Sequence, residues 1–470
     1  MFFFIFLVGH FIIASVTTAH TLLNKEDVRS AIGWIGLAWL SPGLGAGLYY
    51  AFGINRVARR AVKRVDRAQE QLTLVGSRNT CPPESLSKKM ADLSRLGQRM
   101  AGQALLSGNR VDVLQNGDAA YPAMLAQIGA AKRSICLATY IFRSDEVGDQ
   151  FAYALISAHR RGVEIRVLVD AIGSGFFVSR VVRRLKAEGL HVARFMFDRR
   201  PWSMAFVNLR NHKKLLLIDG ERGYVGGLNL GSENTIHFVG ARRVSDIHFS
   251  LAGPVVAQLM QNFERDWEFA TGELLDNQIW WPDIKLRGDS VCRVLTSGPD
   301  EDLGKIETLF AVALGAARSH VRIVTPYFLP DKKLGEALRL AALRGVRVDV
   351  ILPEKSDHVI IDWAMRGHMS FFQSYGLNHY LSTASFDHAK LVTVDGEWCA
   401  FGSPNWDVRS LRLNFELLVE CYTRKVVATI DQLIDDKLRK SRPLQMDELA
   451  AQGLQIKLRN ATARLFLPYL

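Results

Sequence analysis

"NHKKLLLIDG" occupies residues 211–220, and "DHAKLVTVDG" occupies residues 387–396. Both stretches contain the pattern His-x-Lys-x-x-x-x-Asp-Gly. An apolar run that ends in Asp-Gly is typical of a β-strand that enters a tight hairpin turn. The two stretches therefore predict two similar strand-and-turn elements, far apart in one chain, and a fold that contains the same unit twice.

Strand geometry separates the polar residues of each stretch into two groups. Side chains two residues apart on a strand point to the same face. The histidine and the lysine of each stretch therefore share a face: His212 with Lys214, and His388 with Lys390. The aspartate before the turn glycine lies an odd number of residues from its histidine and points the other way. We expect these aspartates to brace the turn or to pair with a basic residue; they are Asp219 and Asp395.

A second strand-like segment follows each turn. It reads "YVGGLN" at residues 224–229 and "CAFGSPN" at residues 399–405. The small residues in its middle allow the backbone to approach a ligand closely. Asn229 and Asn405 lie at the same offset from their histidines, so their amide groups are expected to donate hydrogen bonds to that ligand.

Other segments repeat between the two halves of the chain. "AAKRSICLATYIF" at residues 130–142 resembles "AARSHVRIVTPYF" at 316–328, and "HRRGVEIRVLVD" at 159–170 resembles "ALRGVRVDVILP" at 342–353. In each copy a helix-like segment precedes an Arg-Gly turn and a strand rich in valine and isoleucine, which is the order of an α/β fold. We therefore predict two similar α/β/α halves, residues 109–290 and 291–470, packed with pseudo-twofold symmetry.

The chain begins with two hydrophobic stretches, Phe2 to Leu23 and Ala31 to Ile54. Each approaches the ~20 residues of a membrane-spanning helix. Residues 1–56 are therefore expected to form a membrane anchor of two transmembrane helices. Two alternatives remain open. One is a cleaved signal peptide, although the basic segment that begins such a signal is lacking. The other is a re-entrant hairpin that is broken at Pro42.

Basic residues follow the second hydrophobic stretch. "NRVARRAVKRVDR" at residues 55–67 contains 6 basic residues and a single acidic one. Positive charge beside a span indicates the cytoplasmic side. We therefore expect a multi-pass membrane protein whose two α/β halves lie in the cytoplasm, joined to the anchor by a basic and polar tether at residues 57–108. The helical spacing of the basic residues fits a helix that only sets topology or one that lies on anionic headgroups.

The composition is that of a packed globular protein, with 48% hydrophobic and 23% charged residues in a chain of 470. The net charge of +12 indicates a polyanionic partner, either nucleic acid or an anionic bilayer. The hydrophobic N-terminal stretches favour anionic membrane lipids, and no module that binds nucleic acid is evident. The 5 cysteines are scattered without a Cys-x-x-Cys pair, which indicates reduced thiols in the cytosol rather than disulfides or a zinc site.

The duplicated polar residues suit a reaction at an anionic centre. Two lysines favour the binding of a phosphodiester, and two imidazoles supply a nucleophile and a proton donor. An unperturbed imidazole pKa of ~6.5 permits both roles at neutral pH. A metal site is not expected, because the sequence lacks a cluster of His, Asp and Glu ligands and the nearby lysines repel a cation.

The pattern HxKxxxxDG followed by Gly-Gly or Gly-Ser and an asparagine, present twice, resembles the phospholipase D superfamily. The stretches "RNHKKLLLIDGERGYVGGLNLG", "VRIVTPYFLPD", "FDHAKLVTVDGEWCAFGSPNWDVRSLRLNFE" and "RLFLPYL" extend the resemblance to bacterial cardiolipin synthases of the phospholipase D type. The resemblance covers nearly the whole chain and is weakest between about residues 68 and 110. It implies two phospholipase D-like halves behind two transmembrane helices, in the bacterial inner membrane.

By this resemblance the chain is a phosphatidyltransferase that joins two phosphatidylglycerol molecules into cardiolipin. His212 would attack the phosphorus of one phosphatidylglycerol, and His388 would protonate the departing glycerol. A second phosphatidylglycerol would then attack the phosphatidyl-histidine and release cardiolipin. Because one phosphodiester replaces another, no nucleotide, metal or other cofactor is implied. The alternatives are a hydrolase of the same superfamily, such as a membrane-bound phospholipase D that releases phosphatidic acid, and an inactive membrane scaffold.

The resemblance also implies binding and orienting roles. Four residues would hold the phosphoryl oxygens: Lys214, Lys390, Asn229 and Asn405. As parts of the motif, Asp219 and Asp395 are counted with the catalytic set. Asp246 is expected to orient the imidazole of His212, and Glu416 that of His388. One local departure is Gly226-Gly227, where the superfamily often has Gly-Ser and therefore one more hydroxyl donor.

Several further segments have two interpretations. "GSGFFVSRVVRRLK" at residues 173–186 and "RFMFDRRPWSMAFVNLRNH" at residues 194–212 form either aromatic rims at the bilayer interface or core aromatics beside solvated arginines. "IKLRNATARLFLPYL" at residues 456–470 forms either an amphipathic surface helix or a packed final helix. His358, His368 and His379 lack a repeated partner and are expected to be structural or exposed. The sequence predicts neither the oligomeric state nor the acyl-chain preference.

Overall fold

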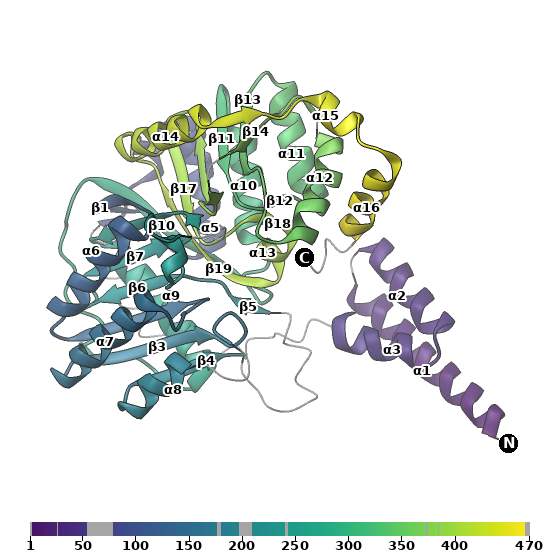
Figure 1. The fold of residues 1–470 in the computed structure, drawn as a ribbon, viewed down its shortest axis with the longest axis horizontal. Helices are drawn as coiled ribbons and strands as arrows, with labels where there is room; N and C mark the ends of the chain where they lie inside the picture. Colours follow the sequence, from purple (N-terminus) through teal and green to yellow (C-terminus); the bar gives the residue numbers. More distant parts are fainter. Residues whose placement is uncertain are drawn as a thin grey trace. The chain divides into compact units, whose positions relative to one another are not determined.

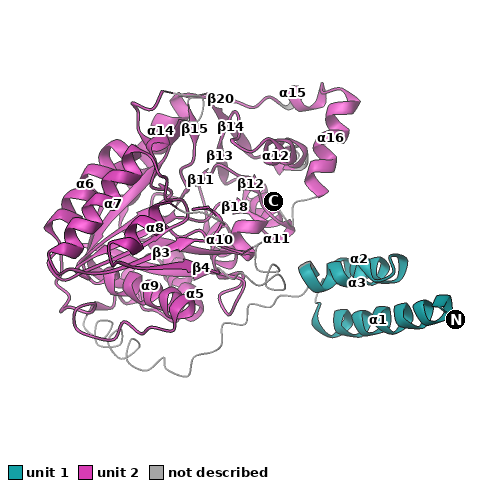
Figure 2. Ribbon diagram, turned by 60° about the horizontal axis from the view of Figure 1, so that its bottom comes forward, with its two compact units in different colours: residues 1–61, 198–208 teal, residues 62–197, 209–470 magenta. Residues whose placement is uncertain are grey.

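The computed structural model describes residues 2–25, 27–53, 79–175, 180–196, 209–239, 243–372, 375–383 and 385–465. The chain divides into two compact units (Figure 2). Unit 1 comprises residues 1–61 and 198–208, and unit 2 comprises residues 62–197 and 209–470. Both copies of the duplicated motif lie in unit 2.

Unit 1 contains the two hydrophobic stretches of the N-terminus. The first forms α1 (Phe2–Asn24), which among the described helices is the one long and apolar enough to cross a membrane. The second is broken into α2 (Val28–Leu40), α3 (Leu44–Leu48) and the π-helical turn η1 (Tyr49–Gly53). The interruption falls at residues 41–43, where proline removes a backbone donor. The predicted second transmembrane segment is thus a broken one, whose longest helix has 13 residues.

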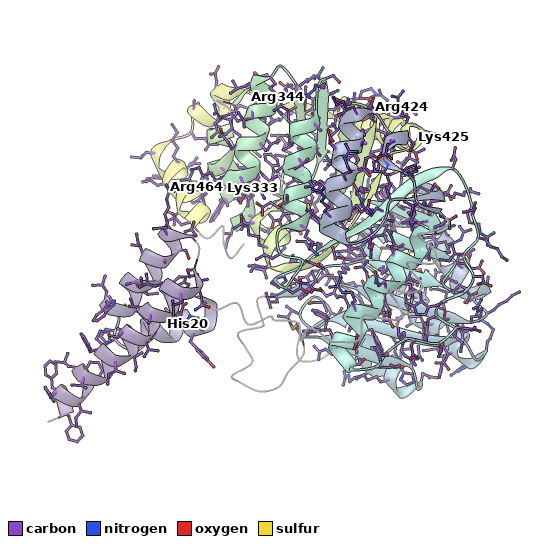
Figure 3. The ribbon with its side chains drawn as sticks, turned by 180° about the vertical axis from the view of Figure 1, so that it is seen from behind. His20, Lys333, Arg344, Arg424, Lys425 and Arg464 are labelled. Carbon is purple, nitrogen blue, oxygen red and sulfur yellow. The ribbon has the colours of Figure 1, made fainter. Side chains whose placement is uncertain are left out.

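Hydrogen bonds tie α1 to the helices that follow it within unit 1. The Nδ1 atom of His20 (labelled in Figure 3) lies 2.8 Å from the hydroxyl of Tyr49. The Nε2 atom of His10 lies 3.1 Å from the carbonyl oxygen of Trp39. The two histidines that interrupt the first hydrophobic stretch therefore have partners within the unit. The basic segment at residues 55–67 lies outside the described residues.

Unit 2 is built around a 16-stranded sheet. Along it the strands follow the order β20-β14-β13-β11-β16-β17-β19-β10-β1-β9-β7-β6-β2-β3-β4, and β5 pairs with β19. The first half contributes β1 (Leu106–Gln115), β2 (Ser134–Thr139), β3 (Glu164–Asp170), β4 (His191–Phe195), β5 (Arg210–Asn211), β6 (Leu215–Ile218), β7 (Arg222–Gly226) and β9 (Ile247–Ala252). The second half contributes β10 (Ser290–Ser297), β11 (His320–Val324), β13 (Arg347–Pro353), β14 (Asn378–Ser382), β16 (Leu391–Val394), β17 (Trp398–Gly402), β19 (Asn414–Cys421) and β20 (Ser441–Pro443).

The strand order repeats on the two sides of the sheet's centre. There β1 and β10 pair antiparallel, with Leu106 opposite Cys292. Outward from β1 the order is β9, β7, β6, β2, β3 and β4, and outward from β10 it is β19, β17, β16, β11, β13 and β14. Each of these strands has a counterpart in the other half. The predicted pair of similar α/β halves with pseudo-twofold symmetry is confirmed.

Helices cover both faces of the sheet (Figure 1). In the first half α6 (Asn116–Ala130), α7 (Glu146–Arg160) and α8 (Arg180–Ala187) share one apolar core with β2 and β3, and α9 (Val255–Thr271) also packs on the sheet. In the second half α10 (Lys305–Ala316), α11 (Lys332–Leu343) and α12 (Val359–Phe372) share a core with β11 and β13, and α14 (Arg424–Arg439) packs on β16 and β17. Both halves therefore bury their sheets in the way the duplicated sequence pattern predicts.

Part of the predicted tether belongs to the folded unit. Within residues 79–108 the chain forms η2 (Pro83–Ser85) and α5 (Lys88–Ala101). Met90 and Leu93 of α5 are buried in the same core as Leu309 and Phe310 of α10. The helical lead-in that the sequence indicates is thus packed against the second half before the first half begins. The remaining described elements are the 12-residue helix α16 (Leu454–Leu465) and seven short ones: η4 (Ser232–Asn234), β8 (Val244–Ser245), β12 (Phe328–Leu329), β15 (Phe386–Asp387), β18 (Trp406–Asp407), α13 (Val408–Arg412) and α15 (Met446–Ala450).

Each Asp-Gly pair forms the predicted hairpin turn. Between β6 and β7, Asp219 and Gly220 have φ values of 52° and 64°; between β16 and β17, Asp395 and Gly396 have 53° and 67°. Positive φ at both central residues defines the type I′ turn, whose twist matches that of the flanking strands. A backbone hydrogen bond of 3.0 Å closes each turn.

The aspartate side chains bind backbone amides at the start of a neighbouring strand. Asp219 accepts hydrogen bonds from the N–H groups of residues 132–134 at 2.7–3.2 Å. Asp395 accepts from those of residues 318–320 at 2.8–2.9 Å, and the ammonium group of Lys89 lies 2.7 Å away. Both aspartates therefore brace their turns, as the alternation of side chains along the strand predicts.

The short strand before each motif histidine crosses to the opposite half. β5 pairs parallel with β19, so that Asn211 lies opposite Phe415. β15 pairs parallel with β8, so that Asp387 lies opposite Ser245. The backbone N–H of His212 then donates to the Phe415 oxygen at 2.9 Å, and that of His388 donates to the Ser245 oxygen at 2.7 Å. Each histidine is thereby attached to the half that does not contain it.

Candidate active site

The two motif histidines are buried and each binds a carboxylate. The Nδ1 atom of His212 lies 3.0 and 3.1 Å from the two oxygens of Glu416. The Nδ1 atom of His388 lies 2.8 Å from Oδ2 of Asp246. With Nδ1–H donated to a carboxylate, Nε2 of each ring carries the lone pair that a nucleophile or base requires.

The pairing of histidines with carboxylates is the reverse of the expected one. Asp246 was expected to orient His212, and Glu416 to orient His388, because each acidic residue follows the histidine of its own half in the sequence. In the structure Glu416 binds His212 and Asp246 binds His388. The reason is the exchange of β5 and β15 between the halves, which places each imidazole beside the strand of the other half.

The two lysines also lie within this buried cluster. Nζ of Lys214 donates to the carbonyl oxygen of His212 at 2.7 Å, and Nζ of Lys390 donates to that of His388. Burial lowers the pKa of Lys214 well below its ordinary value, and it lowers the pKa of Lys390 to about 8. The carboxylates of Asp246 and Glu416 oppose this shift at both lysines.

The charges of each motif also act on the imidazole of the other motif. Burial is the largest cause of the lowered pKa of His388, and the charge of Lys390 is the next largest. The charge of Lys214, from the other motif, lowers this pKa further. Burial likewise lowers the pKa of His212 to about 4; Glu416 opposes the shift, and both Lys214 and Lys390 add to it. Each imidazole binds a carboxylate of the opposite half, and charges of one motif act on the imidazole of the other, so the residues of both motifs contribute to one buried cluster.

The two asparagines have different surroundings. Oδ1 of Asn229 accepts a hydrogen bond from the backbone N–H of Ile141 at 3.3 Å, which leaves its amide N–H₂ as the group to offer a ligand. Oδ1 of Asn405 is buried and has no hydrogen-bond partner among the described residues. The side chain of Asn405 also binds Asp407 and lowers the pKa of that carboxyl, which burial raises to about 6.

The departure at Gly226-Gly227 has a steric cause. A Cβ atom on Gly227 would lie 2.4 Å from both carboxylate oxygens of Asp246, so a serine does not fit there. In the second half Ser403 occupies the equivalent position, and its hydroxyl donates to Glu416. Ser410 donates to the same carboxylate at 2.7 Å. The extra hydroxyl of the second half therefore holds the carboxylate that binds His212.

Aromatic residues that the sequence reasoning did not assign line the site. The ring of Tyr140 lies 5.1 Å from that of His212, and Nζ of Lys214 lies 5.3 Å from the same tyrosine ring. On the other side Phe386 lies 5.8 Å from His388, and Tyr327 lies 6.2 Å from Phe386. A signal was present, because both tyrosines occupy matched positions in the repeated segments "ATYIF" and "TPYF".

A third histidine lies beside the cluster and was also missed. His248 is two residues beyond Asp246 on β9 and is buried. Its Nδ1 atom has no hydrogen-bond partner in the part of the chain that the structure describes. Burial lowers its pKa to about 4, and the charge of Asp246 opposes this. The second half has Leu418 at the same distance from Glu416, so the repeat gave no indication of this residue.

The remaining predicted features have plain outcomes. His358 is exposed, and His379 is buried. The Nε2 atom of His368 lies 2.9 Å from the carbonyl oxygen of Pro330. These surroundings are those expected for exposed or structural histidines. Of the two rim segments, residues 176–179 and 197–208 lie outside the described residues; within the described part Phe195 is buried and packs against Phe269 and Phe415, as a core aromatic does. No group of three or more His, Cys, Asp or Glu side chains is placed to hold a metal ion within the described residues.

The fold and the site define an enzyme of the phospholipase D-like class, in which two motif-bearing halves build one centre. A crystal structure of the phosphatidylserine synthase of Haemophilus influenzae has a similar fold, with a TM-score of 0.63 and 15% sequence identity. The similarity covers 81% of this chain and 100% of that one. At this level of identity the comparison supports the fold alone.

Sequence comparison narrows the class to a family. The profile described as "Cardiolipin synthase, PLD-like domain" matches residues 124–267 and 311–438, more than half of the chain. The cardiolipin synthase of Oceanobacillus iheyensis is 31% identical over 464 residues, which cover 95% of each chain. The major cardiolipin synthase of Bacillus subtilis is 30% identical over 481 residues, which cover 99% of each chain. The chain belongs to the cardiolipin synthase family.

Proposed function

We propose that the chain is a cardiolipin synthase that transfers a phosphatidyl group from one phosphatidylglycerol to another. The observation that carries the proposal is the single buried centre, in which each imidazole is held at Nδ1 by a carboxylate of the opposite half. Two such imidazoles and two ammonium groups provide the nucleophile, the acid and the anion-binding charges for a phosphodiester exchange.

In the first step, Nε2 of His212 attacks the phosphorus of a phosphatidylglycerol. The bond from phosphorus to the glycerol oxygen breaks, and His388 donates a proton to that oxygen. His212 suits the role of nucleophile because burial lowers its pKa to about 4 and keeps it neutral. The bound phosphodiester anion favours the protonated form of His388, which is needed for the acid.

In the second step, the terminal hydroxyl of another phosphatidylglycerol attacks the phosphatidyl group on His212. His388, now neutral, accepts the proton of that hydroxyl, the bond from nitrogen to phosphorus breaks, and cardiolipin leaves. One phosphodiester has replaced another, so the reaction needs no nucleotide. The hydroxyl of water in place of the lipid would give phosphatidic acid, which is the product of the hydrolytic alternative.

The charged and amide side chains bind the phosphoryl oxygens in this scheme. Lys214 and Lys390 supply the ammonium groups, and Asn229 and Asn405 supply the amides. Because the lysines are buried, their charges act through a medium of low dielectric and stabilise the charge that develops on the non-bridging oxygens. Asp219 and Asp395 contribute by fixing the hairpins and not by contact with the lipid.

The chain is associated with the membrane, consistent with its apolar helix α1 and with the family's phospholipid substrates. We propose further that it is a multi-pass protein of the bacterial inner membrane, with unit 2 on the cytoplasmic side. The basic segment at residues 55–67 supports that orientation. Protease added to intact spheroplasts is then expected to spare unit 2 and to degrade it only after lysis.

A product assay tests the proposed reaction. The purified full chain with phosphatidylglycerol as the only lipid is expected to release glycerol and cardiolipin in equal amounts. His212→Ala and His388→Ala are each expected to reduce the rate by on the order of 10³-fold or more. Phosphatidic acid as the main lipid product would favour hydrolysis. The same assay with phosphatidylethanolamine in the mixture decides whether that lipid serves as donor or acceptor.

A further inference from the structure

The helix α16 exposes a continuous stripe of apolar side chains. Leu454 is 72% exposed, Leu458 58% and Leu465 74%. At 100° per residue these three positions and Ala461 fall within about 60° of one another on the helix surface. Exposed leucines that occur singly need no explanation, but a stripe along one face of a helix indicates a contact surface.

The opposite side of α16 packs against α12. Asn460 and Ala463 are the buried residues of α16. A Cβ atom on Gly367 of α12 would lie 2.7 Å from the backbone oxygen of Asn460, so the two helices approach closely there. The guanidinium group of Arg459 lies 4.4 Å from the centre of the Trp363 ring. Figures 1 and 2 both show α16 beside α12. The leucine stripe lies on the side of α16 opposite to the residues buried at this contact and is exposed.

The charge of α16 fits an anionic surface. Its sequence, LQIKLRNATARL, contains three basic residues and no acidic residue. Lys457 and Arg464 both lie along one edge of the leucine stripe by the same helical geometry; Arg464 is labelled in Figure 3. A helix with leucines on one face and lysine or arginine beside them is typical of helices that lie in the interface of an anionic bilayer.

The helix that supports α16 begins next to an aromatic series that leads to the site. An aromatic series runs outward from His388 through Phe386 and Tyr327 to His358, with ring centres 5.8, 6.2 and 6.3 Å apart. The hydroxyl of Tyr327 donates to Asp357 at 2.7 Å. The next residues, Val359 and Ile360, open α12 and are 59% and 51% exposed. Apolar surface is therefore exposed both at the start of α12, beside the outer end of the aromatic series, and on α16.

We propose that α16, together with the exposed start of α12, is the surface by which unit 2 lies on an anionic phospholipid bilayer, so that the His388 side of the site opens toward the lipid. The proposal concerns the catalytic unit itself and is separate from the anchor in unit 1. It resolves the two interpretations of residues 456–470 in favour of a surface helix for the described part. A lipid that enters from the bilayer would pass the apolar and aromatic residues before it reaches the imidazoles.

Spin labelling of the full chain tests the proposal without any reference to activity. All 5 native cysteines are buried, so a nitroxide reagent labels an introduced cysteine selectively. Leu458→Cys is compared with Tyr153→Cys on α7, where the native tyrosine is 66% exposed. In vesicles of phosphatidylglycerol and phosphatidylcholine, the label at 458 is expected to collide several-fold more with oxygen than with a water-soluble nickel complex, and the label at 153 to show the reverse.

Two results of this measurement would overturn the proposal. Equal access of nickel to both labels would mean that α16 remains in water. Protection of the label at 458 from both oxygen and nickel would mean that protein, either another copy or unit 1, covers the stripe. Leu458→Met, which keeps the apolar surface, serves as the control for later kinetic comparison.

Kinetics separate this surface from the chemistry. Leu458→Asp is expected to raise the surface concentration of phosphatidylglycerol that gives half-maximal rate by about tenfold, the loss of one buried leucine, with kcat within twofold of the wild type. Leu458→Met and Tyr153→Asp are expected to change neither value by more than twofold. A short-chain phosphatidylglycerol that stays monomeric in water does not require a bilayer surface. If Leu458→Asp lowered kcat about tenfold on this substrate, α16 would have a structural role instead. Absence of cardiolipin in the wild-type assay would contradict the proposed function and leave the labelling result to stand alone.

Discussion

At the scale of single residues, the site depends on which carboxylate holds which imidazole. Glu416 binds His212, and it also accepts hydrogen bonds from Ser403 and Ser410. Asp246 binds His388 but accepts fewer side-chain hydrogen bonds than Glu416, because Gly227 occupies the position that corresponds to Ser403 and has no hydroxyl to donate. The nucleophile is therefore held by the more strongly supported carboxylate.

Neutral amides at these two positions should affect different steps. Glu416→Gln is expected to slow formation of the phosphatidyl-enzyme by on the order of 10²–10⁴-fold, because the amide no longer fixes the reactive tautomer of His212. Asp246→Asn is expected to slow the acid and base steps at His388 by a similar factor. With a phosphatidyl ester of p-nitrophenol, whose leaving group needs no proton, Asp246→Asn should retain the burst of p-nitrophenol that Glu416→Gln loses. If Asp246→Asn lost the burst and Glu416→Gln retained it, Asp246 would be the residue that orients His212, and the pairing across the halves would be wrong.

The buried lysines predict a pH dependence of the free enzyme. Burial lowers the pKa of Lys390 to about 8, so its charge is present below that pH and lost as the pH rises through it. The rate constant kcat/KM is therefore expected to fall with a break near pH 8, in addition to the break below 6.5 at which His388 loses the proton it donates. In Lys390→Arg, any remaining activity should lack the break near pH 8, since arginine stays charged. Persistence of that break would assign it to another group.

At the scale of elements, the Asp-Gly hairpins are a stability feature. Asp395 accepts hydrogen bonds from three consecutive backbone amides and from Lys89, and these interactions hold its pKa well below the usual range. A carboxylate with a depressed pKa in the folded state contributes stability above its unfolded value of ~3.9, and that stability is lost as the pH falls through the folded value.

Asp395→Asn is thus expected to lower the free energy of unfolding at pH 7 by about 1–3 kcal/mol. The turnover of the folded fraction is expected to stay within a few-fold of the wild type, because Asp395 points away from the site. Chemical denaturation at pH 7 and at a pH below ~3.9 measures the first quantity, with the difference between variant and wild type shrinking only at the lower pH, as the pH approaches the folded pKa of Asp395. A 10³-fold loss of turnover in a fully folded Asp395→Asn protein would instead make this residue part of the chemistry.

Local patterns at this scale predicted much of what the structure shows. The Asp-Gly signal gave both hairpins, and the alternation along the strands placed the lysines with the histidines and the aspartates away from them. Proline 42 correctly marked a break in the second hydrophobic stretch. The exchange of β5 and β15 between the halves was not predictable, since two-residue strands have no periodicity and their partners lie 204 and 142 residues away in sequence.

At the scale of the whole molecule, the two halves share one sheet through β1 and β10. The repeated segments predicted the duplication and the α/β class, because each copy carries the same order of helix, turn and strand. They did not predict that the sheet would be continuous, since the strands that join the halves, β1 (LSGNRVDVLQ) and β10 (SVCRVLTS), mix polar and apolar residues and are not among the repeated segments. His248 was not predicted for a related reason. The second half has Leu418 at the corresponding position, so His248 is not part of the repeated pattern from which the site was inferred.

The central claim is that one centre, assembled across the halves, transfers a phosphatidyl group through His212. Quenched reactions of the His388→Ala full chain with phosphatidyl-p-nitrophenol test it most directly, because the ester needs no acid and the variant lacks the base that activates an acceptor. Peptide mass spectrometry is expected to find the phosphatidyl mass on the peptide that contains His212 and none in the His212→Ala, His388→Ala double variant. An adduct on a different residue, or p-nitrophenol release without any adduct, would contradict the account.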